Sequence, residues 1–178
     1  MNKIDNFLNN PNLIKEFWYK YIDKGAIQMC LQNKAKAETE IADSFTSLLP
    51  SEDFFLPLIY DLKTKIEQNH IDRQKIYVRR WHINISPTGF DGTMHEDNYF
   101  DCPTFLYCLA PFWDPEWGGE FILYDQNKEA IDVCSFKTDR MIIFNGSVTH
   151  RGVAPTRLSS LLRVTIAFQT ELLEKTEN

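Results

Sequence analysis

The stretch KIYVRRWHINIS, residues 75–86, is where the sequence changes from helical to strand-like spacing of its apolar residues. Within it, Trp81, Ile83 and Ile85 alternate with polar residues, which is the period expected of a strand with one buried face. Further strand-like runs follow, separated by turn-forming stretches such as PTGFDG and NGS. These runs are TFLYCLA, EFILYD, AIDVCSF, RMIIFN and LLRVTIAFQT. Short strands in succession, without intervening helices, indicate an antiparallel sandwich or barrel.

Upstream of this point, the stretch NPNLIKEFWYKYIDKG, residues 10–25, has apolar residues at helical spacing. Asn10 can cap the first turn, Pro11 suits the first helical position, and Gly25 is placed as a stop signal. The pattern predicts an amphipathic helix whose apolar side packs against something larger.

A second helix is predicted from near Ser51 to near His70. The apolar residues that set its spacing are Leu56, Ile59, Leu62 and Ile66. Between the two helices, residues 26–50 contain the strand-like AIQMCL and a polar, alanine-rich piece whose role the pattern does not define. We therefore expect a mainly β protein in which an N-terminal helical segment, residues 1–75, packs on a core formed by residues 76–178. The two parts are expected to form one structural unit.

The composition fits one soluble domain of 178 residues with a net charge of −6. An acidic chain has no basic surface for a nucleic-acid backbone, so we expect no nucleic-acid partner. No apolar run approaches the roughly 20 residues that cross a bilayer, and MNKIDNFLNN lacks the apolar core of a signal peptide. We therefore expect a cytoplasmic protein without membrane association. The four cysteines lack CxxC spacing and are expected to be small buried residues.

A candidate metal site lies in GTMHEDNYF, residues 92–100. Residues two apart on an extended chain share a face, so His95 and Asp97 can bind one ion while Glu96 points away. An HxD pair often arises by chance, but His150 follows the strand-like RMIIFN and can supply a third ligand from a strand end. Two imidazoles and one carboxylate on one face of an octahedron leave positions open, as in non-haem Fe(II) oxygenases.

The last strand-like run, LLRVTIAFQT, has two different faces. One carries Leu162, Val164, Ile166 and Phe168, and the other carries Arg163, Thr165, Ala167 and Gln169. The first face is expected to be core. On the second, the planar guanidinium of Arg163 can point into a space that a carboxylate ligand fills. The alternative is an arginine on a solvated face.

Taken together, these motifs resemble the Fe(II)/2-oxoglutarate-dependent dioxygenase superfamily, and in particular its prolyl 4-hydroxylase-like branch. The resemblance covers roughly residues 76–170 and rests on GFDGTMHEDNYFD, TFLYCLAPFWDPEWGGEFILYD, RMIIFNGSVTHRGVAP and LLRVTIAF. It implies a double-stranded β-helix, the jelly roll of cupin-like proteins, with His95, Asp97 and His150 as metal ligands. It also implies that Arg163 binds the distal carboxylate of 2-oxoglutarate. Collagen-type prolyl 4-hydroxylases often have lysine in that role, so the substrate does not transfer directly.

The activity implied by the resemblance couples oxidative decarboxylation of 2-oxoglutarate to hydroxylation of a substrate C–H bond. Its cofactors would be Fe(II), 2-oxoglutarate and O₂, with ascorbate as an optional addition. Related halogenases replace the carboxylate ligand by a small residue, so the intact Asp97 favours hydroxylation. A prolyl residue, a free amino acid or another small molecule are all open as substrates, and the oligomeric state is not defined. The alternative function is a cupin-like metal-binding protein or isomerase, which would need no arginine for 2-oxoglutarate.

Other residues of the cosubstrate site are less well determined. By resemblance, Asn84 is expected to contact the cosubstrate, whereas His82 lines the pocket or is an ordinary core or surface histidine. Family members often have two consecutive aromatic residues where this chain has Tyr107 and Cys108. Either Tyr107 bonds 2-oxoglutarate or that hydrogen bond is missing. Further along the chain, Gly118 and Gly119 are expected to permit a tight turn. Trp113 and Trp117 either line the entrance for the substrate or pack against other side chains.

Overall fold

The computed structural model of the chain describes residues 1–23, 28–32, 44–48, 56–68, 70–71, 74–97 and 101–172. The helices are α1 (Pro11–Phe17), the π-helix η1 (Trp18–Asp23), α2 (Leu56–Glu67) and the 3₁₀ turn η3 (Pro115–Trp117). The strands are β1 (Asn2–Ile4), β2 (Gln28–Gln32), β3 (Ser44–Leu48), β4 (His70–Ile71), β5 (Gln74–Ser86), β6 (Pro103–Leu109), β7 (Phe121–Tyr124), β8 (Ala130–Cys134), β9 (Arg140–Asn145), β10 (His150–Gly152) and β11 (Arg163–Leu172).

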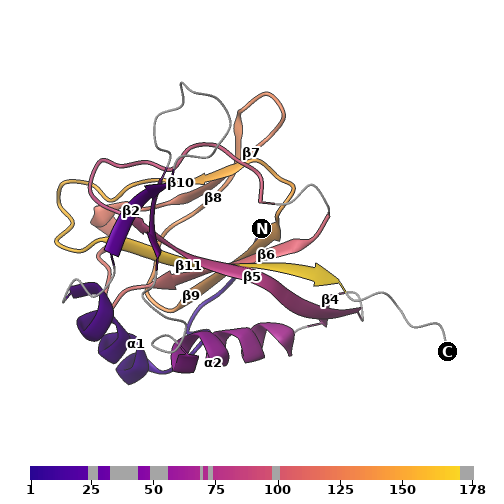
Figure 1. The fold of residues 1–178 in the computed structure, drawn as a ribbon. Helices are drawn as coiled ribbons and strands as arrows, with labels where there is room; N and C mark the ends of the chain where they lie inside the picture. Colours follow the sequence, from indigo (N-terminus) through magenta and orange to yellow (C-terminus); the bar gives the residue numbers. More distant parts are fainter. Residues whose placement is uncertain are drawn as a thin grey trace.

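These strands form two antiparallel sheets, with α1 and α2 beneath the larger one (Figure 1). The larger sheet has the order β1-β9-β6-β11-β5-β3-β2, with β4 also paired to β5. The smaller sheet has the order β10-β7-β8 and lies across the larger one. The chain is thus mainly β with a jelly-roll core, and the predicted fold class is confirmed.

The strand predictions after residue 74 agree closely with the structure. The six runs read from the alternation pattern correspond to β5, β6, β7, β8, β9 and β11. The strand-like AIQMCL overlaps β2. The short strands β1, β3, β4 and β10 were not predicted, because none of them lies in a run of alternating or continuous apolar residues that marks a strand.

The first predicted helix is present, but it is not one uniform α-helix. Asn10 caps it as expected, since its side chain accepts a hydrogen bond from the Leu13 amide at 3.1 Å. After Phe17 the backbone continues as the π-helix η1, which the apolar spacing did not predict. Buried residues continue across the change, with Ile14 in α1 and Trp18 in η1 almost fully enclosed. The predicted stop at Gly25 lies outside the described residues.

The second helix, α2, packs against β5 with its apolar stripe fully buried. Leu58, Leu62 and Ile66 have no exposed surface. The helix ends at Glu67, and His70 belongs to β4 and not to the helix. The predicted start near Ser51 and the alanine-rich piece of residues 33–43 lie outside the described residues. Of the helices in the described part of the chain, none is long and apolar enough to traverse a bilayer.

Strands from the first 75 residues also join the larger sheet. β1 pairs with β9 at its edge, where Asn2 lies opposite Ile143, and β3 pairs with β5, where Phe45 lies opposite Ile85. The N-terminal part therefore extends the sheet as well as covering it. The division of the chain near residue 75 stays a prediction.

The central strand β11 carries the two faces that its sequence predicted. It lies between β5 and β6, with Val164 opposite Ile85 and Thr165 opposite Asn84. Val164, Ile166 and Phe168 are fully buried on the side of the helices. The alternating residues point to the other side, between the two sheets, and this is where the pocket described below is found.

Candidate active site

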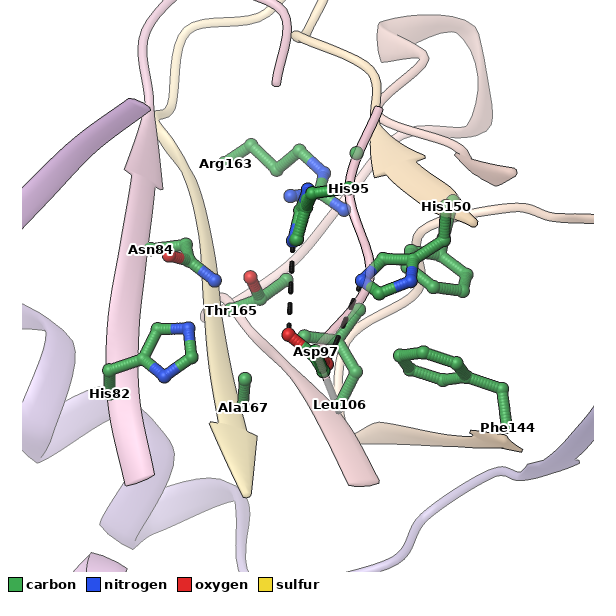
Figure 2. Close-up of a pocket in the computed structure, with 12 residues that line it drawn as sticks. His82, Asn84, His95, Asp97, Leu106, Phe144, His150, Arg163, Thr165 and Ala167 are labelled. Carbon is green, nitrogen blue, oxygen red and sulfur yellow. Dashed lines mark ion pairs between the residues drawn. The ribbon is translucent and has the colours of Figure 1, made fainter. Parts of the chain in front are cut away.

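A pocket lies between strands of the larger sheet and strands of the smaller sheet (Figure 2). Strands β5, β6, β9 and β11 of the larger sheet supply one part of its lining, and β7 and β10 of the smaller sheet supply another. The lining residues are His82, Asn84, His95, Asp97, Leu106, Phe121, Phe144, His150, Gly152, Arg163, Thr165 and Ala167. The pocket thus contains all three predicted metal ligands together with Arg163 and Asn84.

The three predicted metal ligands converge in this pocket. Nε2 of His95 lies 3.8 Å from Oδ1 of Asp97, and Nε2 of His150 lies 3.7 Å from Oδ2 of the same carboxylate. One ligand atom from each residue lies within 4.8 Å of the others. An ion among them would meet two imidazole nitrogens and one carboxylate oxygen, a donor set that suits Fe(II) with open coordination positions.

Each of the two imidazole rings is oriented by a hydrogen bond to a backbone carbonyl oxygen. Nδ1 of His95 is 2.9 Å from the carbonyl oxygen of Thr93, and Nδ1 of His150 is 2.8 Å from that of Val148. A carbonyl oxygen only accepts, so each Nδ1 donates its hydrogen. In a neutral ring this leaves the Nε2 lone pair directed at the centre of the site. This hydrogen bond is the usual way in which proteins orient histidine ligands.

Backbone pairing fixes the relative position of the two histidines. The amide of His95 donates to the carbonyl of His150 at 3.0 Å, and the amide of His150 donates to that of His95 at 2.9 Å. Asp97 is tied to the same region, since its amide donates to Gly146 at 2.8 Å. Phe121 and Phe144 pack on the His150 ring, with centroid distances of 5.3 and 4.6 Å. The ligands are therefore positioned by backbone hydrogen bonds and by apolar rings.

Arg163 provides a buried positive charge in the same pocket. Only 3% of the residue is exposed, and its Nε donates to the carbonyl of Gly119 at 2.9 Å. In the described part of the chain, its two terminal nitrogens donate no hydrogen bond and no carboxylate forms an ion pair with it. Burial lowers the pKa of this guanidinium from its ordinary value. The Glu120 carboxylate acts on this charge electrostatically but accepts no hydrogen bond from it, so the terminal nitrogens are left for a ligand that brings a carboxylate.

Two glycines create the space that Arg163 occupies. A Cβ atom on Gly152 would lie 2.9 Å from Nη1 of Arg163, which is closer than real contacts allow. Gly119 adopts φ +83°, and a Cβ there would lie 3.3 Å from Cδ of Arg163. The expected turn role of Gly118 and Gly119 is supported by their positive φ angles. The sequence analysis did not connect either Gly119 or Gly152 to Arg163.

Asn84 and His82 extend from β5 into the pocket, next to Thr165 and Ala167 of β11 (Figure 2). Across the two strands, Asn84 pairs with Thr165 and His82 pairs with Ala167. Of the two readings of His82, the structure favours a residue that lines the pocket. The cosubstrate contact predicted for Asn84 stays a prediction, with the side chain in a suitable place.

Tyr107 does not face the pocket, which corrects its prediction as a cosubstrate ligand. On β6 it pairs with Ile166 of the core face, whereas Cys108 pairs with Thr165 of the pocket face. The Tyr107 hydroxyl donates to Oδ1 of Asp139 at 2.9 Å, and burial together with this carboxylate raises its pKa. The pocket-side residue here is Cys108, whose thiol stays protonated because burial raises its pKa to about 12.

The two tryptophans pack against neighbouring side chains. Trp113 contacts Trp117 and Phe136, with centroid distances of 5.3 and 4.3 Å, and its Nε1 donates to Gly118. Neither ring lines the pocket. Phe136 in turn lies 5.6 Å from the Arg163 guanidinium. The aromatic group thus supports Arg163 from outside the pocket.

Comparison of the sequence with known proteins identifies no relative, because no protein-family model and no curated protein matches it. The structure does have similar solved structures. A Trichoplax adhaerens prolyl hydroxylase, in complex with a hypoxia inducible factor oxygen degradation domain peptide fragment, matches with a TM-score of 0.69 and 17% identity. The match covers 95% of this chain and 82% of that one.

Two bacterial structures are similar as well. A Pseudomonas putida prolyl-4-hydroxylase has a TM-score of 0.60 and 15% identity, over 97% of this chain and 92% of that one. A 2OG-Fe(II) oxygenase family oxidoreductase from Burkholderia pseudomallei has a TM-score of 0.55 and 14% identity, over 82% and 72% of the two chains. This chain therefore has the fold of the 2OG-Fe(II) oxygenases, and within that fold it resembles the prolyl hydroxylases.

Proposed function

We propose that the protein is a non-haem Fe(II)/2-oxoglutarate-dependent dioxygenase that hydroxylates a C–H bond of a prolyl residue or an amino acid. The observation that carries this proposal is the presence, in one pocket, of a His-Asp-His ligand set and a buried arginine whose terminal nitrogens donate no hydrogen bond among the described residues. The ligand set alone would also fit the alternative of a metal-binding protein or isomerase. The arginine distinguishes them, because such a protein has no need of a buried guanidinium beside its metal.

The pocket residues have two proposed roles, binding of the metal and binding of the cosubstrate. His95, Asp97 and His150 would hold Fe(II), and Arg163 would bind the distal carboxylate of 2-oxoglutarate through its two terminal nitrogens. Asn84 and Thr165 add polar atoms along the same wall. When bound, Fe(II) with 2-oxoglutarate and O₂ would supply the oxidising chemistry that the protein side chains lack. Phe121, Phe144 and Leu106 line the same space and would limit access of water to it.

The choice of a prolyl substrate rests on the similar structures. Two of them are prolyl hydroxylases, and the Trichoplax adhaerens enzyme binds a peptide fragment. Peptides containing proline, free proline and other amino acids are therefore the first candidates to test. The substrate has to approach the metal from the solvent, and His95 is the ligand with the greatest exposure, 32% of its side chain.

The function can be tested by measuring succinate formation from 2-oxoglutarate with Fe(II), O₂ and ascorbate, first alone and then with each candidate substrate. We expect slow succinate release alone and faster release, matched by hydroxylated product, with the correct substrate. His95→Ala should abolish both, whereas Glu96→Ala, which changes the exposed residue between the ligands, should not. Protein that binds Fe(II) but forms no succinate under any of these conditions would support the metal-binding alternative instead.

A further inference from the structure

The pocket face of β11 ends in a polar residue that the proposed chemistry has not used, Gln169. Arg163, Thr165 and Ala167 precede it on the same face. Directly after Gln169 the pairing with β5 shifts register, and Thr170 instead donates from Oγ1 to the carbonyl of Pro103 at 2.6 Å. Gln169 is thus the last buried residue on this face of β11, because Glu171, the next one, is partly exposed.

The amide of Gln169 is bonded to a metal ligand. Its Nε2 donates to Oδ1 of Asp97 at 3.2 Å, and only 4% of Gln169 and 7% of the Asp97 side chain are exposed. Burying a primary amide is unfavourable unless its hydrogens are bonded, so this contact accounts for a glutamine in an otherwise enclosed position. Asp97 is consequently held twice, through its amide by Gly146 and through its carboxylate by Gln169.

The two oxygens of Asp97 have different surroundings as a result. Oδ1 accepts from Gln169 and lies 3.8 Å from Nε2 of His95, while Oδ2 lies 3.7 Å from Nε2 of His150 and accepts no side-chain hydrogen bond within the described residues. A hydrogen bond to Oδ1 occupies one lone pair of that oxygen and leaves those of Oδ2 available to a metal. It also resists the rotation that would bring both oxygens onto one ion. A chelating carboxylate would occupy one more coordination position, which a cosubstrate and O₂ both need.

We propose that Gln169 is a positioning residue that holds Asp97 as a one-oxygen ligand and thereby keeps a coordination position of the metal open. This inference rests on the proposed function, because it takes His95, Asp97 and His150 as metal ligands. It assigns the glutamine no contact with substrate or cosubstrate. Gln169 and Arg163 both lie on β11, so the same strand would position the metal through Gln169 and the cosubstrate through Arg163.

The test compares Gln169→Met with Gln126→Met, using Mn²⁺ alone as the probe. Methionine keeps the length of glutamine but has no N–H donor, and Gln126 is an exposed residue of the β7–β8 turn. We expect Gln169→Met to bind Mn²⁺ about 10- to 100-fold more weakly, the usual effect of losing such a support. We also expect lower water-proton relaxivity of the bound Mn²⁺, because the second carboxylate oxygen replaces a bound water. Gln126→Met should match the wild-type protein in both.

The relaxivity decides the proposal. An unchanged relaxivity for Gln169→Met would overturn it, whatever the affinity does. If that variant does not fold, Gln169→Asn serves instead, since it retains an amide that is one methylene too short to reach Asp97. Failure of the proposed function looks different, because then the wild-type protein itself would bind no Mn²⁺, or His95→Ala would bind it equally well.

Discussion

The two faces of β11 are buried to the same extent but are stabilised differently. On the helix side, Val164, Ile166 and Phe168 are apolar and satisfied by packing alone. On the pocket side, Arg163 and Gln169 are nearly as enclosed, at 3% and 4% exposure, although both are polar. Burial therefore does not separate the core from the site. The polar residues of the pocket side differ in how their donors are used. Gln169 donates to another side chain of the protein, whereas Arg163 has donors left for a ligand.

The largest effect that this comparison predicts is on the pocket side. Asp97→Ala removes the one anionic ligand of the proposed metal site, so Fe(II) affinity should fall strongly and turnover should be lost almost completely. The melting temperature of the metal-free protein should remain close to that of the wild type, because the apolar face of the sheet is untouched. Calorimetric titration with Fe(II) and succinate measurement check the two parts. Full activity in Asp97→Ala would exclude the proposed ligand set.

The second prediction separates two arginines that follow His150. Arg163→Ala should raise the 2-oxoglutarate constant roughly 30-fold to several thousand-fold, since losing one partner of a buried charge pair costs about 2 to 5 kcal/mol. Fe(II) binding should stay intact. Arg157 is exposed, and Arg157→Ala should leave the constant within about threefold. Titration with 2-oxoglutarate checks both variants, and the opposite ranking would make Arg157 the cosubstrate ligand.

The third prediction concerns the helix side. Phe17 is 3% exposed in α1, and Phe17→Asp places an unpaired charge in the apolar layer. We expect a loss of roughly several kcal/mol in the free energy of unfolding, measured by denaturant titration. Tyr19→Asp introduces the same charge at a residue that is 51% exposed and should cost much less. Equal stability of the two variants would mean that the helix layer does not cover the sheet.

The smallest effect is expected for Tyr107, which the structure places on the helix side of β6. Tyr107→Phe removes one hydrogen bond to Asp139, and a buried hydrogen bond contributes about 1 kcal/mol. The variant should melt slightly earlier and bind 2-oxoglutarate as the wild type does. A clear rise in the 2-oxoglutarate constant would show that Tyr107, and not Cys108, faces the pocket. Tyr60→Phe, at a residue that is 67% exposed, is the matched control.

The sequence predicted the strands well wherever one face differed chemically from the other. In β11 the alternation of apolar and polar residues identified both the strand and the face that lines the pocket, and in β5 it identified the strand. In β6 all seven residues are buried, so both faces look apolar. The sequence therefore could not show which of Tyr107 and Cys108 points toward the pocket. The three-residue strands β1 and β10 are fixed by their partners β9 and β7, which no local pattern reveals.

The site was predictable to the extent that its residues form short motifs. His95 and Asp97 are two positions apart, and His150 follows a recognisable strand. The supporting residues carry weaker signals. Gln169 was visible as a polar residue on the pocket face, but only the fold shows that Asp97 lies within its reach. Gly152 and Gly119 matter because Arg163 passes close to them, and that approach joins residues far apart in the sequence.

The reciprocal hydrogen bonds between His95 and His150 give the site a property that can be measured without substrate. Residues 92–97 bond to the smaller sheet through the backbone of β10, including the bond from Gly92 to Gly152, and Asp97 also bonds to Gly146 in the turn after β9. A segment attached at a sheet edge opens locally more often than the whole domain unfolds. An ion bound by both His95 and His150 would have to dissociate before this edge opens. Deuterium uptake at the amides of His95, Asp97 and His150 should therefore slow on metal binding, while the amides between β6 and β11 change little. The rate of deuterium uptake at these three amides would therefore report the fraction of the protein that has metal bound.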